Sequence, residues 1–169
     1  MRYPAIIILA LFLLNFSSCK TIQKTVGEKE LLKIDSTKTT VTKINLFKNK
    51  RLEVSEVNGS LNYTMVDDPG FNVIQFDYQK DIDKMAYDGG YREEVVFEFP
   101  NTPAEQDYED GQLQKTKLLF GRYCFCRGYT GLYKINQGKL HLAISKKESR
   151  FELHFRTDAV PQLTTEIKY

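Results

Sequence analysis

The stretch RLEVSEVNGSLNYTMV, residues 51–66, indicates the fold class of this chain. It is centred on Asn58 and Gly59, and this dipeptide is the strongest short predictor of a two-residue hairpin turn, because both turn positions need a positive φ. Counting outward from the turn places Leu52 opposite Met65. Successive side chains on a strand point to opposite faces, so one face of the hairpin is apolar. We therefore predict two antiparallel strands that cover a core.

Further segments with strand-like alternation follow this hairpin along the chain. Residues 91–99 (YREEVVFEF) alternate Val95 and Phe97 with Glu94 and Glu98, a pattern typical of a half-buried strand. Residues 116–127 are apolar on both faces, which predicts a central strand. The other expected strands cover residues 72–79, 132–136, 139–145, 150–156 and 162–168. We predict an all-β, single antiparallel meander domain of about eight or nine strands, closed as a barrel or packed as a two-sheet sandwich.

The composition agrees with this fold class and limits the partners. The chain has ten Tyr, eleven Phe and no Trp, and aromatic and β-branched residues favour strands. Its 24 basic residues are nearly balanced by 22 acidic ones. A nucleic-acid-binding surface needs a basic excess, so we expect no nucleic-acid partner.

The N-terminus has the pattern of an export signal. Arg2 precedes the apolar residues 4–14 (PAIIILALFLL), which fit a secretory signal but are too short to span a bilayer as a helix. The residues that follow, FSSC at 16–19, resemble the lipobox of bacterial envelope lipoproteins. This resemblance implies cleavage before Cys19 and attachment of lipid to its sulfur. Several acyl chains would anchor the protein to a membrane almost permanently.

The same resemblance gives a location and a division of the chain. The residues after Cys19 are Lys20 and Thr21, so the aspartate that retains some lipoproteins at the inner membrane is absent, which implies the outer membrane. No acidic patch of the kind that exports some lipoproteins to the cell surface follows, which implies a domain facing the periplasm. We expect a lipoprotein signal peptide at residues 1–18 and a lipidated, Lys/Thr-rich tether at residues 19–50. The antiparallel β domain would then occupy residues 51–169.

The stretch KLHLAISKKESRFELHFR, residues 139–156, carries both histidines of the chain. With residues 146–149 as its loop, the hairpin would place His141 directly opposite His154 on a polar face. Two facing imidazoles with Glu152 beside them have the chemistry to hold Zn²⁺ or Cu²⁺. Basic residues share that face and would repel a cation, so we favour an exposed polar surface over a metal site.

Cys124 and Cys126 form a second pair with chemical potential. Their Cα atoms would be ~6.6 Å apart in an extended strand, at the upper limit for a disulfide. Three states remain open: buried reduced thiols, a disulfide closed by a local bend, and a Cu(I) site. Pairing across residues 128–131 would turn Cys124 toward Ile135 and Cys126 toward Tyr133, both facing the core.

The remaining motifs do not indicate an enzyme. No serine occurs in Gly-x-Ser-x-Gly, and no carboxylate pair is isolated in apolar surroundings. The acidic residues within 100–114 do not have the spacing of a calcium loop, so we expect a solvated linker there, and we expect no cofactor.

We predict a binding or structural role for a lipid-anchored domain, with a small ligand or an envelope protein as partner in addition to the membrane. A protein partner would contact exposed aromatic residues, either Tyr129 and Tyr133 or Tyr87 and Tyr91. The alternative is a copper- or thiol-redox-handling lipoprotein. It would use Cys124 and Cys126, helped by His141 and His154.

Overall fold

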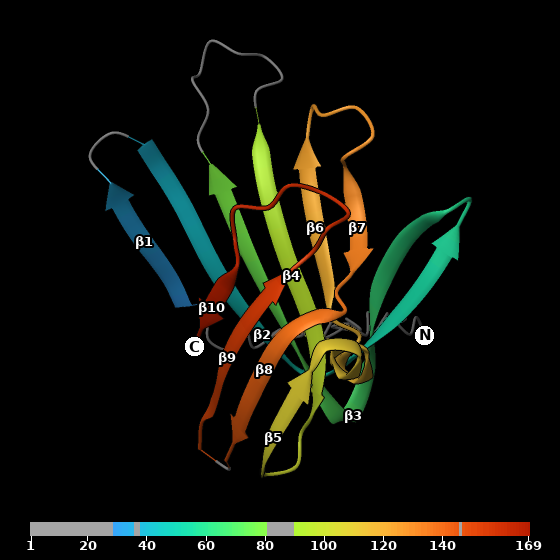
Figure 1. The fold of residues 1–169 in the computed structure, drawn as a ribbon. Helices are drawn as coiled ribbons and strands as arrows, with labels where there is room; N and C mark the ends of the chain where they lie inside the picture. The colour runs from blue at the N-terminus through green and yellow to red at the C-terminus, as the bar shows by residue number, and fades with distance from the viewer. Residues whose placement is uncertain (1–28, 36–37, 81–89, 146) are drawn as a thin grey trace, which may run out of the picture.

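The structure, a computed structural model, describes residues 29–35, 38–80, 90–145 and 147–169. The expected signal peptide, Cys19 and Tyr87 lie outside these residues. The described part contains ten strands and a short 3-10 helix (Figure 1). The elements are β1 (Lys29–Asp35), β2 (Lys38–Val57), β3 (Ser60–Lys80), β4 (Tyr91–Pro100), β5 (Ala104–Glu109), η1 (Asp110–Thr116), β6 (Leu119–Cys124), β7 (Gly131–Lys134), β8 (Gln137–Ile144), β9 (Ser149–Arg156) and β10 (Glu166–Lys168).

The strands form two antiparallel sheets. One has the order β1-β2-β3-β4-β6-β7 and the other β10-β9-β8-β5. The chain leaves the first sheet after β4 to form β5, returns for β6 and β7, and then completes the second sheet with β8 to β10. The predicted all-β antiparallel class is confirmed, as an open two-sheet sandwich and not a closed barrel (Figure 1).

The core lies between the inner faces of the two sheets and is rich in phenylalanine. Phe97 of β4 meets Phe151 of β9 edge to face, with ring centroids 5.2 Å apart. Phe120 of β6 lies against Phe155 of β9, with centroids 5.8 Å apart. Aromatic rings in such contact contribute large apolar areas and about 0.5–1.5 kcal/mol per pair beyond the burial itself. The side chains therefore fill the space between the sheets.

The β2–β3 hairpin extends beyond this sandwich as a distal arm, formed by residues 50–57 and 60–67. Its register places Leu52 opposite Met65, as predicted, and Val57 opposite Ser60 beside the turn. The ladder shifts between Lys48 and Lys50, so the arm is offset from the rest of the hairpin. Figure 1 shows the arm, in teal and green, on the β7 side of the sheet.

The arm covers the second face of the six-stranded sheet. Leu52 of the arm is 0% exposed and packs with Val73, Val96 and Leu119 in a cluster separate from the main core. β4 is consequently buried on both faces, with Glu94 2% and Glu98 4% exposed. The prediction that β4 is half-buried was wrong, because alternation within one strand does not reveal a second layer supplied by a distant hairpin.

Two predicted irregular segments contain regular structure. Residues 29–50, assigned to the tether, include β1 and the first half of β2, and Ile44 is a core residue at 4% exposure. The folded part therefore begins well before residue 51. Residues 100–114, expected to be a linker, contain β5 and most of η1. β5 pairs with β8, which orients Glu105, Asp107 and Glu109 toward solvent and explains their acidic character.

Candidate functional site

The solvent-facing side of the four-stranded sheet, here called the charged face, carries both histidines. Strand alternation turns Leu140, Leu153 and Ile167 inward and their polar neighbours outward. The outward residues form two cross-strand rows. The rows are Glu109, Lys139, His154 and Glu166, and Asp107, His141, Glu152 and Lys168. Acidic and basic residues alternate along the second row, and in the first row a carboxylate stands at each end, beside Lys139 and His154. Opposite charges are the favourable arrangement for cross-strand pairs.

The prediction that the two histidines face each other was wrong. His141 pairs with Glu152, and His154 pairs with Lys139. The turn is shorter than expected because the Ser145 hydroxyl accepts the N–H of Glu148 at 2.9 Å, while the Ser145 N–H donates to the Glu148 carbonyl at 2.8 Å. The register moves by two residues. An even shift leaves every side chain on its predicted face, so the apolar face was predicted correctly.

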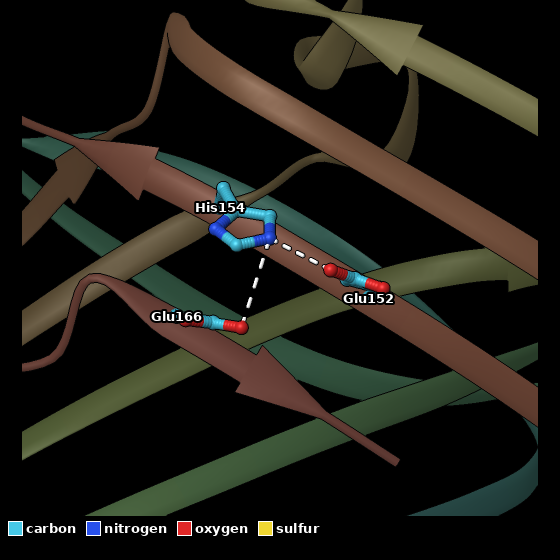
Figure 2. Close-up of side chains that lie close together, drawn as sticks. All are labelled: Glu152, His154 and Glu166. Atoms are coloured by element: carbon cyan, nitrogen blue, oxygen red, sulfur yellow. Dashed lines mark hydrogen bonds and ion pairs between the residues drawn. The ribbon is translucent and has the colours of Figure 1, made fainter.

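Figure 2 shows a group of three side chains around His154 that could together hold a metal ion. One donor atom each from Glu152, His154 and Glu166 lies within 4.8 Å of the others. The His154 Nε2 atom is 2.8 Å from Glu152 Oε1 and 3.7 Å from Glu166 Oε1. One imidazole and two carboxylates form a donor set that suits Zn²⁺.

Lys168 already neutralises this cluster. Its Nζ atom is 2.9 Å from Glu152 Oε1 and 2.6 Å from Glu166 Oε1. The hydrogen bond with His154 and then the one from Lys168 lower the pKa of Glu152, and Lys168 lowers that of Glu166. Both groups are therefore carboxylates at neutral pH, held by an ammonium group that a metal ion would have to displace. The arrangement is an exposed ion-pair network.

A depression open to solvent lies beside the cluster. Its walls come from the starts of β8 and β10 and the end of β9, with Lys139, His154, Arg156 and Glu166 among its lining residues. Arg156 donates to the Gln137 amide oxygen at 2.5 Å, which fixes one wall. Most of its lining residues are polar, and they include charges of both signs, so the depression offers hydrogen-bond and ion-pair partners to a ligand.

His141 has an acidic partner of its own. Its Nδ1 atom is 2.8 Å from Asp107 Oδ1, and its Nε2 atom is 3.6 Å from Glu105 Oε1. The hydrogen bond to Asp107 is the main cause of a raised pKa for His141. Because the pKa rises on folding, this contact stabilises the fold below about pH 6.5, and the contribution is lost as the pH rises through the folded-state pKa.

Asp107→Asn is expected to lower the pKa of His141 toward its ordinary value, because the charged hydrogen-bond partner is removed. The measurement is an NMR titration of the imidazole protons, which is simple in a chain with two histidines. Glu105→Gln is the matched control, since its longer contact predicts a smaller decrease. An unchanged His141 pKa in Asp107→Asn would contradict the assignment of Asp107 as the main partner.

Cys124 and Cys126 form a disulfide at the end of β6, with Cα atoms 5.1 Å apart. Of the three states left open by the sequence, the structure contains the bent disulfide. The predicted pairing of Cys124 with Ile135 was wrong, because the β6–β7 ladder ends at Arg122 and Gly131 and the disulfide lies in the connection beyond it. The bend at the disulfide ends β6 at Cys124, three residues before the end of the strand predicted over residues 116–127.

The structure does not bring the cysteines and histidines together. The disulfide belongs to the six-stranded sheet, whereas His141 and His154 lie on the outer face of the other sheet. A centre that combines all four residues is therefore not formed. The two histidines lie in neighbouring rows of the charged face, each bonded to its own carboxylate.

The predicted partner tyrosines differ in exposure. Tyr129 is 50% exposed in the β6–β7 connection, Tyr133 packs against the main core, and Tyr91 is half-buried. Burial and the hydrogen bond that the Tyr91 hydroxyl donates to Glu93 raise the pKa of Tyr91 to about 12. Sequence reasoning missed Phe125, which is 86% exposed. The sequence contained one indication of this exposure. If Cys124 and Cys126 are joined in a small ring, the side chain between them has to point away from the ring.

A second missed feature is a set of buried carboxylates on β4. Glu93 is 0% exposed and accepts the backbone N–H groups of Leu163 and Thr164 at 2.6 and 2.7 Å. Glu98 accepts the Leu52 N–H at 2.7 Å and lies 2.9 Å from Lys117 Nζ. These carboxylates join the β9–β10 connection and the distal arm to the sheet. Their bonds are structural, since each oxygen is occupied by a protein donor.

No family model, no curated protein and no solved structure matches this chain. The fold places the chain in the class of all-β, two-sheet antiparallel sandwiches, with a distal arm added to one sheet. None of the helical segments in residues 29–35, 38–80, 90–145 and 147–169 has the length and apolar character needed to cross a membrane.

Proposed function

We propose that this chain is a lipid-anchored protein of the bacterial cell envelope whose β-sandwich has a binding or structural role. The observation that carries the proposal is the Cys124–Cys126 disulfide. Disulfides persist in oxidising compartments such as the periplasm and are rare in the cytosol. This points to export independently of the lipobox-like sequence that ends at Cys19. In the proposed arrangement, lipid on Cys19 holds the sandwich at the periplasmic face of the outer membrane.

The packing favours binding at the surface over binding inside the sandwich. Phe97, Phe120, Phe151 and Phe155 fill the space between the sheets with ring-to-ring contacts. The depression beside His154 is open to solvent and lined mostly by polar residues. Exposed apolar side chains are more typical of contact with a large partner, and Phe125 and Tyr129 are the most prominent ones in a single connection. We therefore propose an envelope component as the partner.

The anchor is tested by metabolic labelling with radioactive palmitate. Label is expected in the wild-type protein and absent from Cys19→Ser, because the thiol at that position is the acylated group. The double variant Cys124→Ser/Cys126→Ser is the control and should keep the label. Recovery of the unlabelled wild-type chain as a soluble secreted protein would contradict the anchoring.

The disulfide is tested separately by alkylating the purified protein and measuring its mass. Without reductant, we expect no alkylation at Cys124 or Cys126, and two added groups after reduction. Two thiols that react freely without reductant would show that the disulfide does not form. The proposal would then lose its evidence for an oxidising compartment. Retention of Cu(I) by those thiols would favour the copper-handling alternative.

A further inference from the structure

The last two residues of β6 and its connection to β7, together residues 123–130, form a projecting tip built around the disulfide. Phe125 lies between the two bonded cysteines and is 86% exposed, the highest value among the large apolar side chains described. The Tyr129 N–H donates to the Cys126 carbonyl at 3.1 Å, which closes a turn directly after the ring. The tip therefore presents Phe125 on a short, covalently restrained backbone, so little conformational entropy is lost when it is buried.

Arginine side chains flank the exposed aromatic residues. The Arg122 guanidinium lies 5.4 Å from the centroid of the Tyr91 ring and 6.0 Å from that of Tyr129, and it donates to the Tyr129 carbonyl at 3.3 Å. Arg127 is exposed next to the disulfide. No acidic residue occurs in the sequence from 111 to 147. The β6–β7 hairpin is thus aromatic and basic, the combination that meets the acyl boundary and the phosphate groups of a lipid bilayer.

The position of the tip fits the proposed lipid anchor. Successive ladder pairs place Lys29, the first described residue of β1, in the same cross-sheet row as Phe120, four residues before Cys124. Four residues of strand correspond to ~13 Å. The ten residues from Cys19 to Lys29 span up to ~35 Å when extended. A lipid on Cys19 and the tip can therefore reach one membrane surface.

We propose that the tip inserts Phe125 into the interfacial region of a phospholipid bilayer, with Arg122 and Arg127 at the level of the phosphates. The inference rests on the proposed envelope location. A bilayer fits better than a protein partner because the exposed apolar groups of the tip are one projecting side chain and a half-exposed tyrosine. A stable protein interface needs about 800 Å² on each partner, usually from a broader surface. The insertion would fix the orientation of the domain on the membrane.

The test uses the absence of tryptophan from the chain. Phe125→Trp introduces a single tryptophan, whose emission can be excited separately from that of the tyrosines, into the acylated full-length protein. The protein is reconstituted into vesicles of phosphatidylethanolamine and phosphatidylglycerol. We expect the emission maximum to move to shorter wavelength, and lipids with brominated acyl chains to quench the emission about twofold or more, because the indole reaches the interface. Adding Arg127→Glu is expected to reduce this quenching by about half, since it places a negative charge among the phosphates.

Val57→Trp is the matched control, because Val57 is 57% exposed at the end of another hairpin, the distal arm. Its emission should not respond to brominated lipid. Vesicle flotation separates the two proposals: protein that floats without quenching at residue 125 overturns the insertion and leaves the anchor intact, whereas protein that does not float overturns both. A blue shift that needs no lipid and grows with protein concentration would assign the tip to contact between copies, and it would also overturn the insertion.

Discussion

Glu93→Ala is expected to lower the free energy of unfolding by about 3–5 kcal/mol. The carboxylate is 0% exposed, and its two oxygens accept the N–H groups of Leu163 and Thr164 at 2.6 and 2.7 Å. A hydrogen bond to a charged group contributes about 1.5–3 kcal/mol, and alanine would leave both donors without that acceptor. The loss is measurable by equilibrium unfolding in urea. Hydrogen exchange at residues 163 and 164 should accelerate in the variant.

Two further variants separate this bonding role from a general effect of removing charge. Glu105→Ala removes a carboxylate whose side chain is 75% exposed, so we expect a change within about 0.5 kcal/mol. Glu93→Gln keeps the shape and one acceptor oxygen, and its cost should lie between those of the two alanine variants. A cost below about 1 kcal/mol for Glu93→Ala would show that water replaces the carboxylate, and that the β9–β10 connection does not depend on it.

Local sequence rules predicted the strand register correctly only in the hairpin whose turn residues specify it. In residues 51–66, Asn58 and Gly59 allow one turn geometry, and the pairing of Leu52 with Met65 was correct. In residues 139–156 no comparable dipeptide occurs, and the predicted register was wrong by two residues. The faces were still correct, because the apolar alternation tolerates an even shift but not an odd one.

The features that sequence reasoning missed depend on distant parts of the chain. The burial of Glu94 and Glu98 comes from the distal arm, which no pattern within β4 indicates. Glutamate on an alternating strand ordinarily faces solvent, so the burial of Glu93 and its hydrogen bonds to the β9–β10 connection could not be predicted either. Ile44 belongs to the core although its surroundings are rich in lysine and threonine. A strand that contributes few apolar residues was therefore assigned to the tether.

The candidate sites show the same division. The exposure of Tyr129 followed from its position in a turn, and it forms part of the tip. The facing histidines depended on the register and were not found, whereas the cluster of Glu152, His154 and Glu166 arises from the pairing of β9 with β10. β10 is a strand of three residues, too short to be delimited from alternation alone. A short edge strand can therefore determine which charged groups meet on the surface, although its own sequence pattern is too short to predict it.

Gly138→Ala is expected to lower the free energy of unfolding by about 4 kcal/mol, near the upper end for single substitutions. Gly138 has a φ of +138°, and an added Cβ would lie 2.1 Å from the His154 carbonyl oxygen and 2.7 Å from Phe155 Cα. Both atoms belong to the backbone of β9, so relief of the clash requires separating β8 from β9, and the conformation itself is unfavourable for alanine. Chemical denaturation measures the loss.

Gly111→Ala, where no atom lies within 4 Å of the added Cβ, is the control and should change stability by less than about 0.5 kcal/mol. Equal stabilities of the two variants would contradict the close approach of the strands at Gly138, and with it the position of His154 beside the depression.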